Sequence, residues 1–168
     1  MPAAFCNSLY SGSELCASME PPPGGVYGGQ LDTVLRMFDI KRSGIEGSLG
    51  FPVSLSPEET AVVFDEVSPR AVTLVDETRE LIDALTPPAE LRADHDLLIE
   101  YFDRLLDATK EFAAAAAAGD LDAAGVVLSR MDEIGCEAQD SFFEARESVP
   151  PSVLGPLIER VIECEPRF

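Results

Sequence analysis

A stripe of inward-facing positions at helical spacing is the feature that most limits what this chain can fold into. Between residues 91 and 112 the stripe advances in alternating steps of four and three residues, and charged residues occupy the opposite positions. This period indicates an amphipathic helix with one buried face. The predicted inward residues are Leu91, His95, Leu98, Phe102, Leu105, Thr109 and Phe112. The predicted outward residues are Asp96, Glu100, Asp103, Asp107 and Lys110.

A second stripe precedes the first and opens on a helix-start signal. Ser56 offers an N-cap hydroxyl, Pro57 suits the first helical position, and Glu59 completes a capping box. The stripe keeps its phase through Pro69, which predicts one kinked helix, although Ser68 and Pro69 could instead cap a second helix. The expected inward residues are Val63, Val67, Ala71, Leu74, Thr78, Leu81 and Leu85. The short turn at residues 87–88 favours an antiparallel neighbour.

A third stripe follows Gly119 and Asp120, which are typical of a helix end and of an N-cap. Its expected inward residues are Leu121, Ala124, Leu128, Met131, Gly135, Ala138, Phe142 and Ala145. A last helix is predicted from about Ser152 to near Cys164. Three long helices and a short one joined by brief turns predict an all-α fold, an antiparallel three- to four-helix bundle over residues 57–168.

Residues 1–56 differ from the rest because glycine and proline are concentrated at 21–29 and 43–52. Such a composition is typical of irregular structure. Leu31, Val34, Leu35 and Phe38 recur at helical spacing, so a short helix is expected near residues 31–40. We therefore expect a largely irregular N-terminal segment that contains one short helix docked on the bundle.

The chain carries 12 basic and 31 acidic residues among 168, a net charge of −19. Such a surface repels phosphate backbones and anionic lipids, so we expect neither nucleic-acid binding nor membrane attachment. No apolar run is long enough for a membrane-spanning helix. The predicted protein is soluble and globular. The first residues do not resemble a secretory signal, which predicts a cytoplasmic location unless an upstream leader is missing, in which case the location is extracytoplasmic.

His95 is the one residue with an obvious claim to acid–base or metal chemistry, because it falls on an inward stripe. The favoured interpretation is a neutral imidazole that is hydrogen-bonded to a carbonyl or carboxylate. The alternative is a haem or metal ligand. Ser141 and Thr109 lack a second histidine or a lysine at a suggestive spacing, so no catalytic residue and no cofactor are predicted. Adjacent acidic pairs are expected on solvated helix faces.

Four cysteines, Cys6, Cys16, Cys136 and Cys164, contain no CxxC pair. Cys164 lies one heptad after Leu157 and Cys136 lies at the edge of the third stripe, so these two can meet. Four cysteines allow three connectivities, and in an oxidising compartment we favour bridges between Cys136 and Cys164 and between Cys6 and Cys16. In a reducing cytosol the same residues stay thiols, which leaves open a cytosolic, thiol-regulated protein.

Residues 85–96, with the alanine-rich helix that follows and the turn at Gly119 and Asp120, resemble a loosely defined group of small helical proteins from actinobacteria. Members are commonly predicted to be exported proteins or lipoproteins. The resemblance implies an envelope or extracellular setting, cysteine pairing between distant segments and no catalytic residue.

The function expected from these features is that of a non-catalytic helical bundle. It would bind an unknown protein or small-molecule partner or serve as a structural component. The alternatives are a haem- or metal-binding bundle that uses His95 and a cytosolic protein regulated through its thiols.

Overall fold

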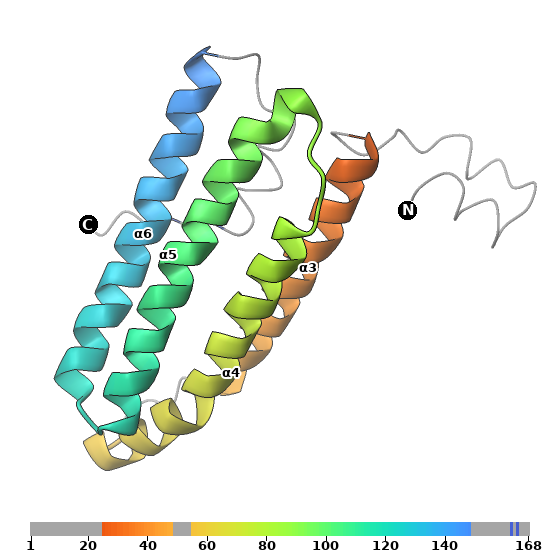
Figure 1. Ribbon diagram of the computed structural model, residues 1–168. Coiled ribbons are helices and arrows are strands. Elements are labelled where there is room, and N and C mark those ends of the chain that lie inside the picture. Colours follow the sequence, from red (N-terminus) through yellow and green to blue (C-terminus); the bar gives the residue numbers. More distant parts are fainter. Residues whose placement is uncertain (1–24, 49–54, 149–161, 163, 165–168) are drawn as a thin grey trace, which may run out of the picture.

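The structure is a computed structural model, and it describes residues 25–48, 55–148, 162 and 164. Four long helices account for most of them: α3 (Gly25–Ser48), α4 (Pro57–Asp83), α5 (Arg92–Ala117) and α6 (Leu121–Ser148), with the short 3-10 helix η1 (Ala89–Leu91) before α5. Consecutive helices run in opposite directions, and α3 lies behind α4 (Figure 1). The described residues form no strand, and the predicted all-α antiparallel bundle is confirmed.

The helices pack in chain order: α4 and α6 both pack against α5, and α3 packs against α4. In the described part of the chain no comparable packing joins α3 to α6. All four helices nevertheless contribute to one hydrophobic core. Its large side chains that are almost completely buried are Leu31, Ile82, Leu98, Phe102 and Ile162. Among the described helices, the side between α3 and α6 is therefore the least closed.

Helix α5 agrees with the sequence prediction at every assigned position. All seven predicted inward residues are buried, and all five predicted outward residues are exposed. The Thr109 hydroxyl donates to the Leu105 carbonyl at 2.7 Å, so this polar side chain is satisfied inside the core. The agreement follows from the strict separation of apolar and charged residues along this segment.

The turn between α5 and α6 also forms as predicted. Gly119 has a φ of +68°, the left-handed region that favours glycine after a helix end. Its N–H donates to the Ala116 carbonyl at 2.9 Å and the Asp120 N–H donates to the Ala115 carbonyl at 3.0 Å, which is the Schellman pattern. The Asp120 carboxylate then accepts from the Ala123 N–H at 2.9 Å as the N-cap of α6. The two helices are thereby joined by a tight reversal.

Helix α4 begins with the predicted capping box. The Ser56 N–H donates to the Glu59 carboxylate at 2.8 Å, and the Glu59 N–H donates to the Ser56 hydroxyl at 3.3 Å. The helix continues through Pro69, so the prediction of one helix is confirmed over the alternative of two. Proline leaves the carbonyl of Asp65 without its helical partner. Both residues are exposed, and water can reach that carbonyl.

The predicted inward faces of α4 and α6 need a local correction. Leu81 is 48% exposed, whereas its neighbour Ile82 is fully buried. On α6, Val127 is buried in the core while Leu128 remains partly exposed. Adjacent helical residues point about 100° apart, and a pair of neighbouring apolar residues does not reveal which one faces inward. The packing of α4 and α6 against α5 determines which residue of each pair is buried.

The helix predicted near residues 31–40 is present and packs on the bundle, but it is longer than predicted, so the irregular structure expected on either side of it was wrong within residues 25–48. A short helix was expected near residues 31–40, but α3 spans Gly25–Ser48 and includes five glycines. Each glycine costs up to about 1 kcal/mol relative to alanine. Tyr27, Leu31, Leu35 and Phe38 are buried in the core, and each such side chain contributes roughly 1.5–3 kcal/mol. Tertiary burial therefore outweighs poor helix propensity.

The predicted last helix lies outside the described residues except at two positions. Ile162 is buried in the core and Cys164 is half-buried, and neither is helical. Phe142 is buried as predicted. No described helix combines the length and the apolar content that spanning a bilayer requires.

Exposed ion pairs join each packed pair of helices. Such pairs contribute at most about 1 kcal/mol each, so they favour one register more than they stabilise the fold. The pairs are Lys41–Glu77 between α3 and α4, Arg79–Asp103 between α4 and α5, and Arg104–Glu137 and Arg130–Glu111 between α5 and α6.

Candidate functional site

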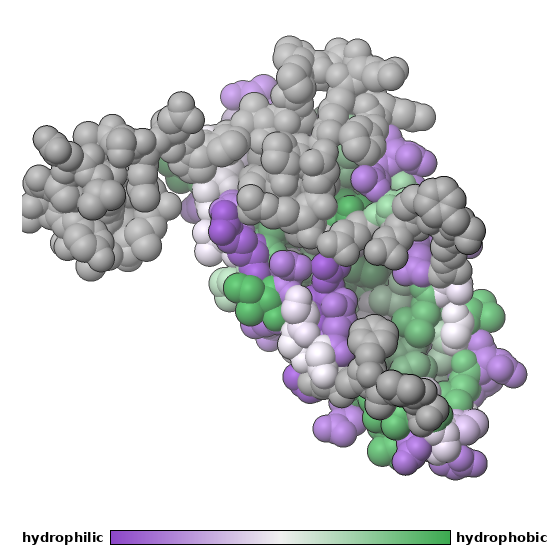
Figure 2. All heavy atoms as spheres, turned by 180° about the vertical axis from the view of Figure 1, so that it is seen from behind, coloured by the Kyte–Doolittle hydropathy of each residue, from purple (hydrophilic) through white to green (hydrophobic). Residues whose placement is uncertain are grey.

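A pocket of about 280 Å³, partly open to solvent, lies between the helices of the bundle and is called the interior pocket below; side chains from α3, α4, α5 and α6 line it. The pocket lies between α3 and α6, which do not pack closely against each other in the described part of the chain, and α4 and α5 form its other walls. On the face turned away from the viewer in Figure 1, hydrophobic surface is visible between hydrophilic residues (Figure 2). Pockets between the helices of bundles commonly bind small molecules.

The wall of the pocket is mostly apolar and rich in aromatic rings. Phe38, Phe64, Tyr101 and Phe112 line it together with aliphatic side chains. The rings of Phe64 and Phe112 meet edge to face, with centroids 5.1 Å apart and planes at 60°. This geometry is the favoured one for aromatic pairs and fixes both rings in place. The pocket therefore offers a rigid apolar surface contributed by three helices.

Arg42 supplies the cationic group of the pocket. Its Nη2 donates to Asp39 at 3.1 Å, and its Nε lies 3.6 Å from a Glu46 carboxylate oxygen. The guanidinium carbon lies 6.0 Å from the centre of the Phe38 ring. The 3.6 Å between Nε and Glu46 is too long for a hydrogen bond, and the buried Nε–H has no acceptor in the described part of the protein. A buried donor without an acceptor is uncommon and calls for an explanation.

Tyr101 brings a second polar group to the same pocket. The side chain is only 7% exposed and packs edge to face against Phe102, with centroids 5.1 Å apart. Burial raises the pKa of Tyr101 to about 12, and the nearby positive charge of Arg42 partly opposes this shift. The hydroxyl is therefore protonated at neutral pH. Within the described residues it forms no hydrogen bond.

His95 is buried on the inward face of α5 as predicted, but its partner is different from the one expected. A carbonyl or carboxylate was predicted, whereas Nδ1 lies 2.8 Å from the Tyr27 hydroxyl. Burial, with help from Asp94 and Asp96, raises the pKa of Tyr27 to about 12. The phenol therefore stays protonated and donates to Nδ1, so neutral His95 carries its proton on Nε2. The two rings meet edge to face at 5.9 Å.

The Tyr27–His95 pair has the properties of a structural contact between α3 and α5. Neither residue lines the interior pocket. Within the described residues no group of three or more histidine, cysteine or acidic side chains is arranged to hold a metal ion. The Tyr27 hydroxyl occupies Nδ1 of the imidazole.

We expect His95 to make the protein less stable in mild acid. Burial lowers the pKa of His95, while the carboxylates of Asp96 and Asp83 oppose this shift and Arg92 adds to it. The unfolded chain then binds the proton more readily than the folded protein. The stabilising contribution is complete above the unfolded pKa of about 6.5 and is lost as the pH falls through the folded value.

Urea denaturation at a series of pH values measures this effect. The free energy of unfolding should decrease on acidification from about pH 7 to pH 5. In His95→Gln, whose amide oxygen can still accept from the Tyr27 hydroxyl, the decrease should be smaller. An equal decrease in both proteins would contradict the assignment.

Two of the four cysteines are brought together as predicted. Cys136 on α6 and Cys164 form a disulfide, with sulfur atoms 2.07 Å apart. Cys6 and Cys16 lie outside the described residues. Gly135, the residue before Cys136, lines the interior pocket, and Ile162 is buried two residues before Cys164. The disulfide therefore fastens Cys164 to α6 next to a residue of the pocket wall.

The predicted acidic pairs lie on solvated faces. Glu58, Glu59, Asp65, Glu66, Asp76, Glu77, Asp132 and Glu133 are all exposed. Ser141 donates to the Glu137 carbonyl at 2.9 Å and is also exposed, a common arrangement for a helical serine.

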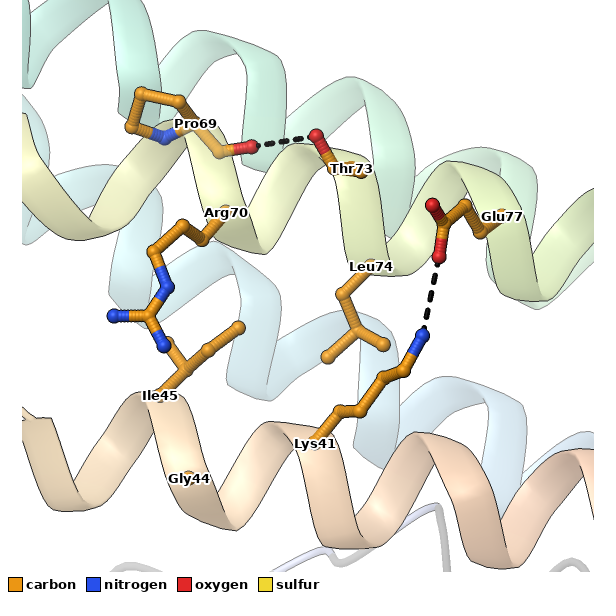
Figure 3. Close-up of a pocket in the computed structure, with 8 residues that line it drawn as sticks. All are labelled: Lys41, Gly44, Ile45, Pro69, Arg70, Thr73, Leu74 and Glu77. Atoms are coloured by element: carbon orange, nitrogen blue, oxygen red, sulfur yellow. Dashed lines mark hydrogen bonds and ion pairs between the residues drawn. The ribbon is translucent and has the colours of Figure 1, made fainter.

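A second hollow, a surface cleft of about 570 Å³, runs between α3 and α4. Figure 3 shows Lys41 reaching across it to Glu77 at 3.2 Å, while Arg70 extends toward Ile45. Ile45 and Leu74 line both the cleft and the interior pocket. Only two helices bound the cleft, so it encloses a ligand less completely than the interior pocket does.

Sequence reasoning missed the residues that define this pocket. Arg42 lies in a segment that was interpreted as irregular, and Tyr101 was hidden beside the stronger core signal of Phe102. Clustered aromatic residues on the inward stripes were the available signal, yet aromatic residues also fill ordinary cores. Comparisons of the chain with protein-family models, curated proteins and solved structures found no match.

Proposed function

We propose that this bundle binds a small apolar molecule in its interior pocket and does not catalyse a reaction. The observation that carries the proposal is the aromatic-lined pocket of about 280 Å³ among four helices. Protein interiors are close-packed and contain few voids larger than a water molecule. A cavity of roughly 150 Å³ lined by apolar side chains is enough to hold benzene. The volume here therefore suits a ligand of about two fused rings.

The composition of the pocket wall supports binding over catalysis. Aromatic and aliphatic side chains dominate, and the ionisable groups are Arg42, Glu46, Asp132 and Tyr101. Nucleophilic catalysis pairs a nucleophile with an adjacent base. His95, the one histidine of the chain, is held by Tyr27 away from the pocket. This proposal narrows the wider expectation of a non-catalytic bundle that binds a partner or serves as a structural component.

The alternatives from the sequence have less support. A haem or metal site at His95 would need further ligands, and within the described residues no group of three or more histidine, cysteine or acidic side chains is placed to hold a metal ion. The disulfide between Cys136 and Cys164 favours an oxidising, extracytoplasmic setting over regulation through free thiols in the cytosol. The resemblance to small exported helical proteins points the same way.

Filling the pocket should weaken ligand binding without unfolding the protein. Ala71 lines the pocket on α4, and Ala71→Leu places three additional carbon atoms there. We expect naphthalene to bind the original protein saturably with 1:1 stoichiometry, and to bind Ala71→Leu at least tenfold more weakly. Isothermal titration calorimetry measures the affinity, and thermal denaturation checks that the variant is folded.

Ala61→Leu is the matched control, because Ala61 lies on the same helix but not on the pocket wall. It should bind naphthalene like the original protein. Absence of saturable binding to the original protein would contradict the proposed function. Equal affinities of the original protein and Ala71→Leu would place the binding elsewhere and would also contradict it.

A further inference from the structure

We propose that the ligand of this pocket is a neutral apolar molecule with one hydrogen-bond acceptor, such as a carbonyl oxygen, held by Arg42 and Tyr101. This inference rests on the proposed function and adds the chemical class of the ligand. It follows from two groups on the pocket wall, Arg42 and Tyr101, each of which has a donor without an acceptor among the described residues.

Two hydrogen-bond donors on the pocket wall, from Arg42 and Tyr101, are available to a ligand. The buried Nε–H of Arg42 has no acceptor among the described residues, since Glu46 stays 3.6 Å away. The hydroxyl of Tyr101 forms no hydrogen bond to another described residue, although Arg42 Nε is the one fully buried side-chain atom without a partner among the described residues. Both residues line the same pocket, on α3 and α5. Leaving a buried donor unsatisfied destabilises a protein, and an acceptor on a ligand would remove that penalty.

Carboxylates surround these donors. The positive charge of Arg42 is already offset by Asp39 at 3.1 Å and by Glu46. Asp132 adds another carboxylate to the wall, and the whole chain carries a net charge of −19. A carboxylate or phosphate on the ligand would be repelled by these groups. A cation would be attracted by them but would leave both donors unsatisfied, so a neutral acceptor fits both observations.

Both donors lie beside the aromatic rings of the pocket wall. The guanidinium of Arg42 lies over the ring of Phe38, and Tyr101 immediately precedes the core residue Phe102 and packs against it. Phe64 and Phe112 form the apolar part of the same pocket. A ligand with a flat apolar body and one polar end can therefore contact the rings and the donors at once.

Four probes of nearly equal shape test the inference on the full chain: naphthalene, 2-acetylnaphthalene, 2-naphthoate and 2-naphthylmethylammonium. Calorimetric titration at pH 7 measures each dissociation constant. We expect 2-acetylnaphthalene to bind about tenfold more tightly than naphthalene, because a hydrogen bond from a charged donor is worth roughly that factor. The naphthoate should bind more weakly than the ketone, and so should the ammonium.

Two variants assign the preference to the named donors. Arg42→Met keeps an unbranched apolar stem and Tyr101→Phe keeps the ring, so both should still bind naphthalene. Each should reduce the advantage of the ketone over naphthalene severalfold. Arg36→Met is the control, because Arg36 is an exposed arginine on α3 that pairs with Asp32 outside the pocket. It should leave the advantage unchanged.

The outcomes separate this inference from the function on which it rests. Failure of all four probes to bind contradicts the proposed function itself. Binding of naphthalene and the ketone with equal affinity overturns the inference and leaves the apolar pocket standing. Tightest binding of the naphthoate or of the ammonium also overturns it, and so does an unchanged ketone preference in both pocket variants.

Discussion

Replacing Phe102 with alanine is expected to lower the free energy of unfolding by about 3–5 kcal/mol. The side chain is 0% exposed at the centre of α5 and belongs to the core shared by all four helices. Its ring meets Phe38 of α3 edge to face at 5.3 Å and touches Tyr101 at 5.1 Å. Alanine would leave a cavity and remove the aromatic contact between Phe38 of α3 and α5. Urea denaturation followed by circular dichroism measures the loss.

Val126→Ala provides the comparison, because Val126 is 71% exposed on α6. It should change the free energy of unfolding by no more than about 0.5 kcal/mol. A Phe102→Ala variant as stable as Val126→Ala would contradict the central position of Phe102. Exposure of α3 to proteolysis should also increase in Phe102→Ala, since that helix loses a major anchor.

Removing the disulfide is expected to have the next largest effect. Cys136 and Cys164 are separated by 28 residues, and closing a loop of that length restricts the unfolded chain. The chain-entropy relation gives a stabilisation of about 3–4 kcal/mol for such a loop. The double variant Cys136→Ser/Cys164→Ser should therefore unfold at a lower urea concentration. Ile162, buried two residues before Cys164, should lose much of its protection with it.

The double variant isolates this bond from Cys6 and Cys16. A reducing agent should lower the midpoint of unfolding of the original protein more than that of the variant. Equal midpoints for the original protein and the variant under oxidising conditions would show that the bond contributes nothing to stability. Mass spectrometry of an unreduced tryptic digest identifies the cross-linked peptides directly.

Much of the fold followed from the sequence because apolar and charged residues are cleanly separated in its central part. The buried face of α5 was predicted at each assigned position, and the caps at Ser56, Gly119 and Asp120 form as expected. These features depend on local chemistry, which a sequence records directly. The choice between Leu81 and Ile82 depended on the neighbouring helix, and a single stripe does not contain that information.

The extent of α3 could not be predicted from local propensity. Five glycines argue against a helix over Gly25–Ser48, and only the burial of residues such as Tyr27 and Phe38 makes it stable. The Tyr27–His95 hydrogen bond joins residues 68 positions apart, so its partner could not be read from the surroundings of His95. Periodicity identified His95 as buried but did not identify what satisfies it.

The pocket was beyond prediction for a related reason. Its wall takes residues from four helices, and its existence depends on α3 and α6 remaining apart. Arg42 and Tyr101 stand out because the described residues offer no acceptor to the Arg42 Nε–H or to the Tyr101 hydroxyl. A periodic pattern of apolar residues contains no information about hydrogen-bond acceptors. The cysteine pair was easier to predict, because Cys164 lies one heptad after Leu157 and Cys136 lies at the edge of the third stripe.

The central claim is that an apolar ligand enters the interior pocket, and the methyl groups of methionine test it most directly. Met131 lines the pocket on α6, whereas Met37 is 47% exposed on α3 and does not. In protein labelled with ¹³C at the methionine methyl groups, titration with naphthalene should shift the Met131 signal saturably and leave Met37 unchanged. Met131→Leu assigns the signal. Saturable binding that shifts Met37 and leaves Met131 in place would contradict the claim.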